Sequence, residues 1–292
     1  MKTPLIMLGI GFVTLVACGG GGSSSSSPNG QLSLGISDGP IEEASAVVVA
    51  FNSVTLQPAN GTAIVVNLDE TDTINLLDYQ GDNRAMLLDG FSLPAGNYNW
   101  IRLGVSEDPD DTYIVTGGHQ YTLDAPSLDQ TGLKMNRGFT ITAGGTSDFT
   151  IDFDLRKSVH ETGSGDYKLR PTVRLEDNSE VATLSGTVAL VANCDDATGN
   201  AVYLFEGADI IPQDIQGNDG DPFATASANY NADTNKYDFE IGFVPFGDYT
   251  VAFTCDAESD DMYADDSATV AFVVQANTSI IDGNGAVVDL VE

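Results

Sequence analysis

The stretch that decides the fold is Asp148-Phe149-Thr150-Ile151-Asp152-Phe153-Asp154-Leu155, in which polar and apolar residues alternate without a break. Successive side chains of an extended strand point to opposite faces, so the pattern predicts a β-strand with one polar and one apolar face. No amphipathic helical period longer than a turn or two occurs from residue 30 to residue 178. A second alternation lies upstream, with faces formed by Ile101, Leu103 and Val105 and by Tyr98, Trp100 and Arg102.

The second half of the chain, from Thr183 onward, shows the same period of two. Its clearest run alternates Tyr237, Phe239, Ile241 and Phe243 with Lys236, Asp238, Glu240 and Gly242. Strands with one buried face are typical of antiparallel sheets. We therefore predict an all-β protein with two antiparallel β-sandwich domains in tandem, over residues 30–178 and 183–292.

Several motifs of the first domain follow one another in a characteristic order. They are Leu32-Ser33-Leu34-Gly35-Ile36-Ser37-Asp38-Gly39-Pro40, Val47 to Leu56, Leu76-Leu77-Asp78-Tyr79, Leu93-Pro94-Ala95-Gly96-Asn97-Tyr98 with Ile101-Arg102-Leu103, and Leu169-Arg170-Pro171. Together they resemble the DUF4382 family of bacterial exported domains, over nearly all of residues 30–178. Because that family has no assigned function, the resemblance implies a fold and no chemistry.

A turn followed by a strand marks the second domain. The segment Phe243-Val244-Pro245-Phe246-Gly247-Asp248-Tyr249-Thr250-Val251, with Leu184-Ser185-Gly186-Thr187-Val188 as a first strand, resembles transthyretin-like and carboxypeptidase regulatory-like β-sandwiches. The resemblance implies an accessory sandwich, a class sometimes placed among carbohydrate-binding-like folds.

A Pro-x-Gly-x-Tyr frame occurs once in each half, at residues 94–98 and 245–249. Proline fixes φ and glycine permits positive φ, so turn chemistry alone selects such a frame. Duplication of one domain and independent use of the same turn are both open.

The N-terminus has the features of an export signal. Lys2 is followed by an uncharged apolar run that ends at Ala17, shorter than the roughly 20 residues that span a bilayer as a helix. Leu15-Val16-Ala17-Cys18 resembles the lipobox of bacterial lipoproteins. The resemblance implies a lipoprotein signal peptide over residues 1–17 and a lipid, including palmitate, attached at Cys18. An ordinary secretory signal that happens to end in a cysteine is the alternative.

Residues 18–29 are rich in Gly and Ser and are predicted to form a flexible tether. A domain anchored through lipid needs such a tether to stand clear of the membrane. Gly19, rather than an aspartate, follows the cysteine. In the Gram-negative sorting pattern that this resembles, glycine implies a protein lipid-anchored at the cell outer membrane.

The chain is strongly acidic, with 43 Asp and Glu against 11 Lys and Arg and a formal net charge of −32. Removal of Lys2 with the signal gives 10 − 43 = −33. Such a surface repels nucleic-acid phosphates and anionic headgroups, so the sequence argues against a nucleic-acid partner and for membrane attachment through lipid alone.

Three cysteines occur, and with lipid on Cys18 the remaining pair is Cys194 and Cys255. The alternation of the neighbouring strands directs both thiols into one core, so we predict a disulfide in an oxidising compartment. The bridge would stabilise the fold by roughly 4 kcal/mol on the chain-entropy model. Two buried free thiols are the alternative.

Catalytic signatures are missing from the sequence. The two histidines, His119 and His160, lie in no zinc-binding spacing, and no nucleophile elbow, P-loop or dinucleotide fingerprint occurs. We therefore expect that the protein is not an enzyme. An enzyme of unfamiliar type would need a pocket around one of these histidines.

Three acidic loops have the oxygen ligands that calcium prefers. None has the spacing of an EF-hand, since Asp219 stands where the loop that starts at Asp214 would need glycine. A solvated acidic surface is the simpler explanation, and calcium remains the one candidate cofactor. The loops contain Glu107, Asp108, Asp110 and Asp111; Asp214, Asn218, Asp219 and Asp221; and Asp256, Glu258, Asp260, Asp261, Asp265 and Asp266.

Aromatic side chains offer a second binding hypothesis, because sugars stack on exposed rings. Trp100 is the one tryptophan and is expected in the core or on a sandwich face, whereas a platform would need exposed tyrosines. The tyrosines considered are Tyr113, Tyr121, Tyr203 and Tyr230.

The function that these features favour is non-catalytic binding or scaffolding at the cell envelope, with a protein or a glycan as partner. A carbohydrate-binding surface module, with or without dependence on calcium, is the first alternative. An adhesion or assembly factor is the second.

Overall fold

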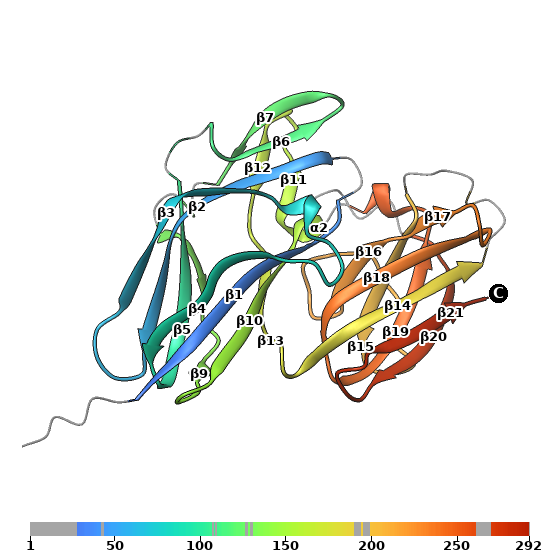
Figure 1. The fold of residues 1–292 in the computed structure, drawn as a ribbon. Helices are drawn as coiled ribbons and strands as arrows, with labels where there is room; N and C mark the ends of the chain where they lie inside the picture. Colours follow the sequence, from blue (N-terminus) through green and yellow to red (C-terminus); the bar gives the residue numbers. More distant parts are fainter. Residues whose placement is uncertain are drawn as a thin grey trace, which may run out of the picture.

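The computed structural model describes residues 28–41, 44–106, 108, 110–125, 128, 131–189, 194, 199–260 and 270–291. The predicted signal peptide, Cys18 and most of the predicted tether lie outside these residues, as do Glu107, Asp261, Asp265 and Asp266. The described part is all-β, as the alternating patterns predict, and forms two domains side by side (Figure 1).

The first domain consists of two packed sheets. One has four strands in the order β13-β10-β1-β4, and the other has nine, β11-β12-β7-β6-β2-β5-β8 with β3 on β2 and β9 on β5. The apolar side chains of β10 pack in the core between them. The elements are β1 (Asn29–Gly39), β2 (Ala44–Pro58), β3 (Ile64–Asn75), η1 (Leu76–Asp78), β4 (Ala85–Pro94), β5 (Gly96–Val105), β6 (Tyr113–Thr116), β7 (His119–Asp124), β8 (Leu133–Met135), β9 (Phe139–Ile141), β10 (Thr146–Asp154), α2 (Leu155–Ser158), β11 (Val159–Glu161), β12 (Tyr167–Leu169) and β13 (Val173–Asp177).

The second domain is a sandwich of two four-stranded sheets, β17-β18-β14-β21 and β16-β15-β19-β20. Its core is separate from that of the first domain and contains Tyr237, Phe239 and Ile241 of β18 and Tyr249, Val251 and Phe253 of β19. The elements are β14 (Val181–Ala189), β15 (Ala201–Glu206), β16 (Ala224–Ser227), β17 (Asn229–Asn231), β18 (Lys236–Pro245), β19 (Gly247–Thr254), η2 (Ala257–Ser259), β20 (Phe272–Ile280) and β21 (Ala286–Leu290).

Most strand pairs are antiparallel, but parallel pairs occur in both domains. β1 pairs with β10 in parallel, from Gln31 opposite Thr146 to Gly39 opposite Asp154. β12 and β7 pair in the same way, as do β14 and β21. Each such pair joins segments far apart in the sequence, which an alternating pattern cannot reveal.

Both Pro-x-Gly-x-Tyr frames make the same contact. The Tyr98 hydroxyl donates to the Pro94 carbonyl, and the Tyr249 hydroxyl donates to the Pro245 carbonyl, each at 2.8 Å. The alternation groups Tyr98 with Trp100 and Arg102, opposite Ile101, but Tyr98 is 2% exposed and belongs to the same core as Ile101. A register shift where β2 pairs with β5, between Gln57 and Pro58, breaks the alternation there.

The alternation of β18 also ends earlier than predicted. Phe243 has φ of +52° and is half-buried, whereas the next residue, Val244, is fully buried. The pairing with β14 shifts between Ala182 and Leu184. Beyond this irregularity the inward-facing positions of β18 move by one residue.

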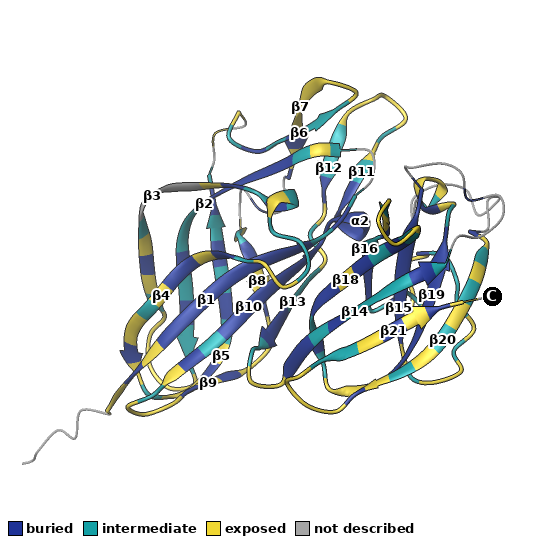
Figure 2. Cartoon of the chain, turned by 45° about the vertical axis from the view of Figure 1, so that its right-hand side comes forward, coloured by how far each residue is buried: buried dark blue, intermediate teal, exposed yellow. Residues whose placement is uncertain are grey.

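The polar face of β10 is not solvent-exposed. Thr150, Asp152 and Asp154 are all less than 9% exposed, although the sequence marks them as the outer face. The second domain packs beside this face near the ends of β1 and β10, and Figure 2 shows these strands and α2 buried along the junction. Thr150 is covered within the first domain, where it meets Arg84 and Asn178, whereas Asp152 and Asp154 line the junction with the second domain.

Candidate functional site: the cleft between the domains

The four-residue turn α2 attaches the first domain to the second. It follows β10 directly, and the side chain of its N-cap residue Asp154 accepts a hydrogen bond from the Lys157 amide. Arg156 and Lys157 are both less than 10% exposed, which is rare for cations without partners. The turn therefore places two buried cations at the junction of the domains.

Arg156 reaches three groups of the second domain. It donates to the Tyr203 hydroxyl and the Thr225 hydroxyl at 3.3 Å each, and to the Ala257 carbonyl at 3.2 Å. Its guanidinium carbon also lies 5.3 Å from the centroid of the Tyr203 ring. Tyr203 is fully buried, so the prediction that it belongs to an exposed aromatic platform is wrong.

Lys157 and Arg174 add two further bonds between the domains. Lys157 donates to the Pro222 carbonyl and lies 3.1 Å from a carboxylate oxygen of Asp154. Arg174 pairs with Asp152, donates to the Phe223 carbonyl and stacks 3.8 Å from the Phe223 ring centroid. Lys157 and Arg174 thus each bind a carboxylate of β10 and a backbone carbonyl of the second domain at the same time.

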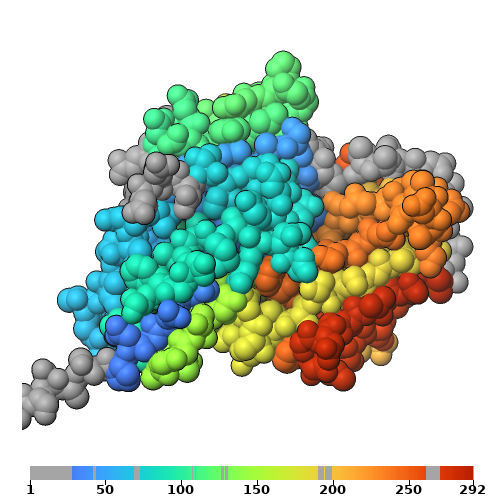
Figure 3. All heavy atoms as spheres, viewed as in Figure 1, coloured from blue at the N-terminus to red at the C-terminus, as the bar shows by residue number. Residues whose placement is uncertain are grey.

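A loop of the first domain closes the junction from another side. The Asp82 amide donates to a carboxylate oxygen of Glu240 on β18 at 3.1 Å. A Cβ atom on Gly242 would lie 1.9 Å from the Gly81 carbonyl oxygen, so the two backbones meet where only glycine fits. Figure 3 shows the atoms of the two domains in contact along this seam.

A cleft of about 590 Å³ lies between the contacts. Its walls come from β1, β10 and β13 of the first domain and from β14, β16, β18 and β21 of the second. Cavities of roughly 300–1,000 Å³ at domain interfaces are the usual size of sites for small ligands. The polar residues of the lining are Asp38, Gln80, Asp152, Asp154, Arg174, Ser185, Thr187, Thr225, Ser227, Asn229, Asp238 and Glu240.

Asp38 is the most unusual residue of this cleft. It is 4% exposed, its carboxylate oxygens are shielded from solvent, and the Leu155 and Gly39 amides interact with them more weakly than a full hydrogen bond would. Burial raises its pKa well above the usual value, and the nearby Asp152 and Asp154 raise it further, while the Leu155 and Gly39 amides offset part of the shift. Burial also raises the pKa of Asp152, against the opposing effect of Arg174.

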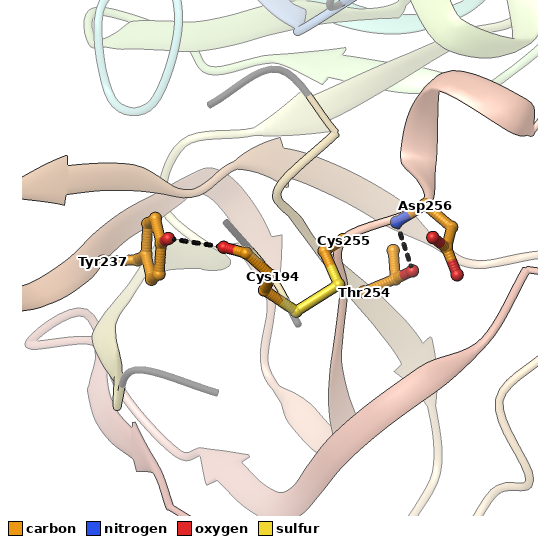
Figure 4. The surroundings of a disulfide bond; sticks show 5 residues. All are labelled: Cys194, Tyr237, Thr254, Cys255 and Asp256. Atoms are coloured by element: carbon orange, nitrogen blue, oxygen red, sulfur yellow. Dashed lines mark hydrogen bonds between the residues drawn. A yellow bond between two sulfur atoms is a disulfide. The ribbon is translucent and has the colours of Figure 1, made fainter. Parts of the chain in front are cut away.

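The predicted disulfide is present in the second domain. Cys194 and Cys255 are bonded with their Cα atoms 5.4 Å apart (Figure 4). Beside the bridge the Tyr237 hydroxyl donates to the Cys194 carbonyl at 2.9 Å. The Asp256 amide donates to the Thr254 hydroxyl at 3.0 Å.

The two histidines lie apart from each other and from this cleft. His119 is exposed at the turn between β6 and β7, and His160 on β11 lines a smaller cavity of about 280 Å³. No serine or cysteine is found among the described residues that line that cavity.

Carboxylates of the described acidic loops mostly hold the loop backbone. Asp108 accepts from the Asp110 amide, Asp221 from the amides of Gln216 and Gly217, and Asp260 from the Ile215 amide. Within the described ranges no group of three or more Asp, Glu, His or Cys is placed to hold a metal ion. Calcium binding stays a prediction for the loop residues outside those ranges.

The remaining aromatic candidates do not form a flat platform. Trp100 is half-buried, with the Arg102 guanidinium carbon 5.0 Å and the Lys134 ammonium 4.7 Å from its ring centroid. Tyr121 is 38% exposed and packs against Tyr167 at an interplanar angle of 51°. Tyr230 is exposed but meets Tyr237 edge-on, and Tyr113 is half-buried. These rings are not arranged as one stacking surface.

Comparison with known proteins identifies the first domain. Residues 29–171 match the family model described as "Domain of unknown function (DUF4382)", so the predicted DUF4382 domain is confirmed. No curated protein matches the chain. Among the described residues no helix is long and apolar enough to cross a membrane.

Solved structures give only distant matches. The Bacillus anthracis TIE protein is 12% identical with a TM-score of 0.19, covering 91% of this chain, which spans 35% of that protein's length. The minor pilin GBS52 of Streptococcus agalactiae is 8% identical with a TM-score of 0.20, over 88% of this chain and 94% of that one. The shaft pilin SpaA of Lactobacillus rhamnosus GG is 12% identical with a TM-score of 0.20, over 91% and 97%. These values are too low to assign a relationship.

Proposed function

We propose that the protein is a non-catalytic binding protein of the cell envelope whose ligand enters the cleft between the two domains. The observation that carries this proposal is the cleft of about 590 Å³, which is lined by strands of both domains. A cavity of this size at a domain interface is typical of the binding sites of small ligands.

A rigid junction suits a binding role. Arg156, Lys157 and Arg174 fix the second domain against the sheet that contains Asp38, so the two walls of the cleft keep their spacing before a ligand arrives. Preorganisation lowers the entropy lost on binding. In this arrangement the second domain is both a wall of the site and a support for it.

The test blocks the cleft without unfolding the protein. Ser185 is half-buried on β14 and lines the cleft, so Ser185→Trp should fill it. Thr122 is exposed on β7, so Thr122→Trp adds the same bulk away from the cleft. We expect the purified chain in nonionic detergent to bind isolated cell-envelope material as wild type and as Thr122→Trp, and to lose at least ten-fold in affinity as Ser185→Trp. Equal binding by all three proteins would contradict the proposal.

Attachment of the protein to the outer membrane through lipid on Cys18 is part of the same proposal. The lipobox-like segment and the Gly/Ser tract after it support it. We expect palmitate labelling and globomycin-sensitive processing of the wild-type chain, with both lost in Cys18→Ala. A Cys18→Ala protein that still fractionates with membranes would exclude the lipid anchor.

Binding assays with the purified chain distinguish a glycan partner from a protein partner. A glycan array, run with calcium and again with chelator, shows saturable binding if the protein is a carbohydrate-binding module, and loss in chelator if calcium takes part. Silence on the array, with binding to envelope proteins, assigns the protein to adhesion or assembly.

A further inference from the structure

Part of the nine-stranded sheet is free of carboxylates, although 43 of the 292 residues of the chain are acidic. Residues 44–68, 90–106 and 130–147 contain no Asp or Glu. These segments include all of β2, β5, β8 and β9 and the start of β3, which are neighbours in that sheet. Figure 1 shows β3 and β5 on the side of the first domain away from the second. The acidic character of the chain is therefore interrupted on this side.

The outer face of these strands contains the one tryptophan of the chain and two cations. Ile101 lies in the core, so its neighbours on β5, Trp100 and Arg102, face outward. Lys134 is exposed on β8, directly opposite Arg102. The Arg102 guanidinium carbon lies 5.0 Å from the centroid of the Trp100 ring, and the Lys134 ammonium nitrogen lies 4.7 Å from it. We call Trp100, Arg102 and Lys134 the Trp100 cluster.

The two cations of the Trp100 cluster lack the counter-charge that most other cations of the chain have. Neither Arg102 nor Lys134 forms an ion pair with any residue of the described ranges, and like charges directly opposite each other destabilise an antiparallel pair. Contact with an aromatic ring is weaker than a charge-assisted hydrogen bond. An anion from outside the chain would therefore stabilise this site. The cations that do pair with a described carboxylate are Arg84, Arg137, Lys157, Lys168, Arg174 and Lys236.

Neutral polar side chains lie beside the Trp100 cluster. Thr55 and Gln57 of β2 are the partners of Arg102 and Trp100 in the pairing of β2 with β5, and both are half-buried. Hydroxyl and amide groups both donate and accept hydrogen bonds, as the hydroxyl groups of a sugar do. The surroundings of the cations thus match a ligand that combines an acidic group with many hydroxyl groups.

The small number of cations separates this ligand from other anionic partners. Proteins that bind anionic lipid by charge typically use clusters of about 4–8 Lys and Arg, whereas the Trp100 cluster has two. The net charge of −32 opposes the approach of nucleic acid. At physiological ionic strength charges are screened beyond about 8 Å, so a single acidic group at the cluster interacts mainly with the carboxylate-free strands around it.

We propose that the Trp100 cluster binds an acidic polysaccharide, with a carboxylate or sulfate group of the polymer paired with Arg102 and Lys134. The neighbouring hydroxyl groups of the sugar lie toward Thr55 and Gln57. This inference goes beyond the proposed function, because none of the three residues of the cluster lines the cleft between the domains.

The fluorescence of Trp100 tests the inference, because this residue is the one tryptophan of the chain. The purified full-length chain in nonionic detergent is titrated with polygalacturonate and with dextran sulfate. Each polymer is compared with its neutral counterpart, which is fully methyl-esterified polygalacturonate or dextran. We expect a saturable change in fluorescence with at least one acidic polymer and none with its neutral counterpart. The polymer that binds identifies the acidic group.

Lys134→Glu is the decisive variant, because it reverses one charge of the cluster at an exposed position. It also places a carboxylate opposite Arg102, so the variant should be at least as stable as wild type in thermal unfolding. Lys236→Glu on β18 is the matched control, since it makes the same change of charge in the second domain. We expect at least a ten-fold loss of affinity for the acidic polymer in Lys134→Glu and none in Lys236→Glu.

Four outcomes would overturn the inference. They are equal loss of affinity in both variants, binding that Lys134→Glu leaves unchanged, equal binding of a neutral counterpart, and silence of both acidic polymers. Vesicles of phosphatidylglycerol and phosphatidylcholine are titrated in parallel, and binding to them with both polymers silent would assign the face to a membrane instead. Ser185→Trp should keep its affinity for the acidic polymer, so failure of this inference is distinguishable from failure of the proposed function.

Discussion

Asp38 is buried where a charge is costly, because its carboxylate oxygens are shielded from water and the Leu155 and Gly39 amides offset only part of that cost. The groups facing it are Asp152 and Asp154 from β10, with Arg174 and Lys157 bound to those two carboxylates. Both neighbouring carboxylates raise the pKa of Asp38 beyond the effect of burial. Ionisation of Asp38 therefore opposes folding.

The first prediction concerns Asp38→Asn and pH. A carboxyl whose pKa is higher in the folded state holds its proton longer there, so stability falls as the pH rises from the unfolded pKa, about 3.9, through the folded pKa. Asp38→Asn removes this loss and should be more stable than wild type at neutral pH, with the difference disappearing near pH 4. Urea unfolding from pH 4 to pH 8 measures the free energy of unfolding of both proteins. In a thermal melt, each 1 kcal/mol of difference would shift Tm by about 2–4 °C for a domain of this size.

Asp89→Asn on β4 serves as the control, because Asp89 is exposed and its replacement should give a stability difference close to zero at every pH. A difference between Asp38→Asn and wild type that stays constant with pH would show that Asp38 does not titrate as burial requires.

At the scale of single elements, the sequence predicts one face of a strand better than the other. The apolar face of residues 148–155 lies in the core as predicted, because period-two alternation is a local property. Its polar face is buried as well: Asp152 and Asp154 are paired with Arg174 and Lys157, and these two cations in turn bond to the second domain. The local sequence pattern cannot reveal this burial, because the groups involved are distant in the sequence. Tyr98 and Phe243 were misplaced for a related reason, since a register shift depends on the partner strand.

The second prediction tests the contact between the loop at Gly81 and strand β18. Gly242→Ala places a methyl group 1.9 Å from the Gly81 carbonyl oxygen, so one backbone must move. We expect a loss of about 1–3 kcal/mol, as for other overpacked sites. Gly283→Ala is the matched control, because a Cβ there has no atom within 4 Å. Thermal unfolding compares the two, and equal stability of both variants would contradict the close approach.

The third prediction concerns the bridge between Cys194 and Cys255, which closes a segment of 61 residues. Replacing both cysteines by alanine should lower the stability of the second domain by roughly 4 kcal/mol, mainly because the unfolded chain gains freedom. Unfolding followed by calorimetry, with and without reductant, measures this. Wild type in reductant should melt like the double variant, and a double variant as stable as the oxidised wild type would show that the bridge contributes nothing.

At the scale of the whole molecule, a few cations couple two domains in an acidic chain. The chain has 11 Lys and Arg in all, and three of them, Arg156, Lys157 and Arg174, are used between the domains. Their acceptors on the second domain include backbone carbonyls, which have no signature in a sequence. The adjacent pair Arg156-Lys157, directly after an alternating strand, was the one available signal, and sequence reasoning did not use it.

The fourth prediction follows from this coupling. Wild type should unfold in one calorimetric transition, because the domains share buried charges. Arg156→Ala with Lys157→Ala leaves Asp154 and the Tyr203 hydroxyl without their cations, and should cost about 3–5 kcal/mol and separate the transition into two.

Lys134→Ala with Lys168→Ala removes the same charge as a control, since Lys134 is exposed on β8. The pair of Lys168 with Asp124 is largely exposed, and such pairs contribute at most about 1 kcal/mol. A single transition in both double variants would mean that the buried cations do not hold the domains together.

The candidate site could not be predicted from the sequence, because it depends on contacts between segments that are far apart in the chain. Asp38 lies in a motif that identifies the family, and Asp152 and Asp154 lie in the stretch that identifies the fold. Their meeting depends on the parallel pairing of β1 with β10 and on the second domain above them. The predicted disulfide succeeded because only two cysteines remained after Cys18 was assigned to lipid.

The parallel pairing of β1 with β10 also fixes when the chain can fold. Gln31 meets Thr146 across 115 positions, and Arg156 meets Ala257 across 101. A ribosome delivers the amino end first, so β1 waits for β10, and α2 then waits for the last third of the molecule. Early contacts cannot close the structure, and distant pairings of this kind fold slowly. The first domain therefore stays open until β10 and β13 have been made, and until then its chain can still be threaded end first through a narrow channel.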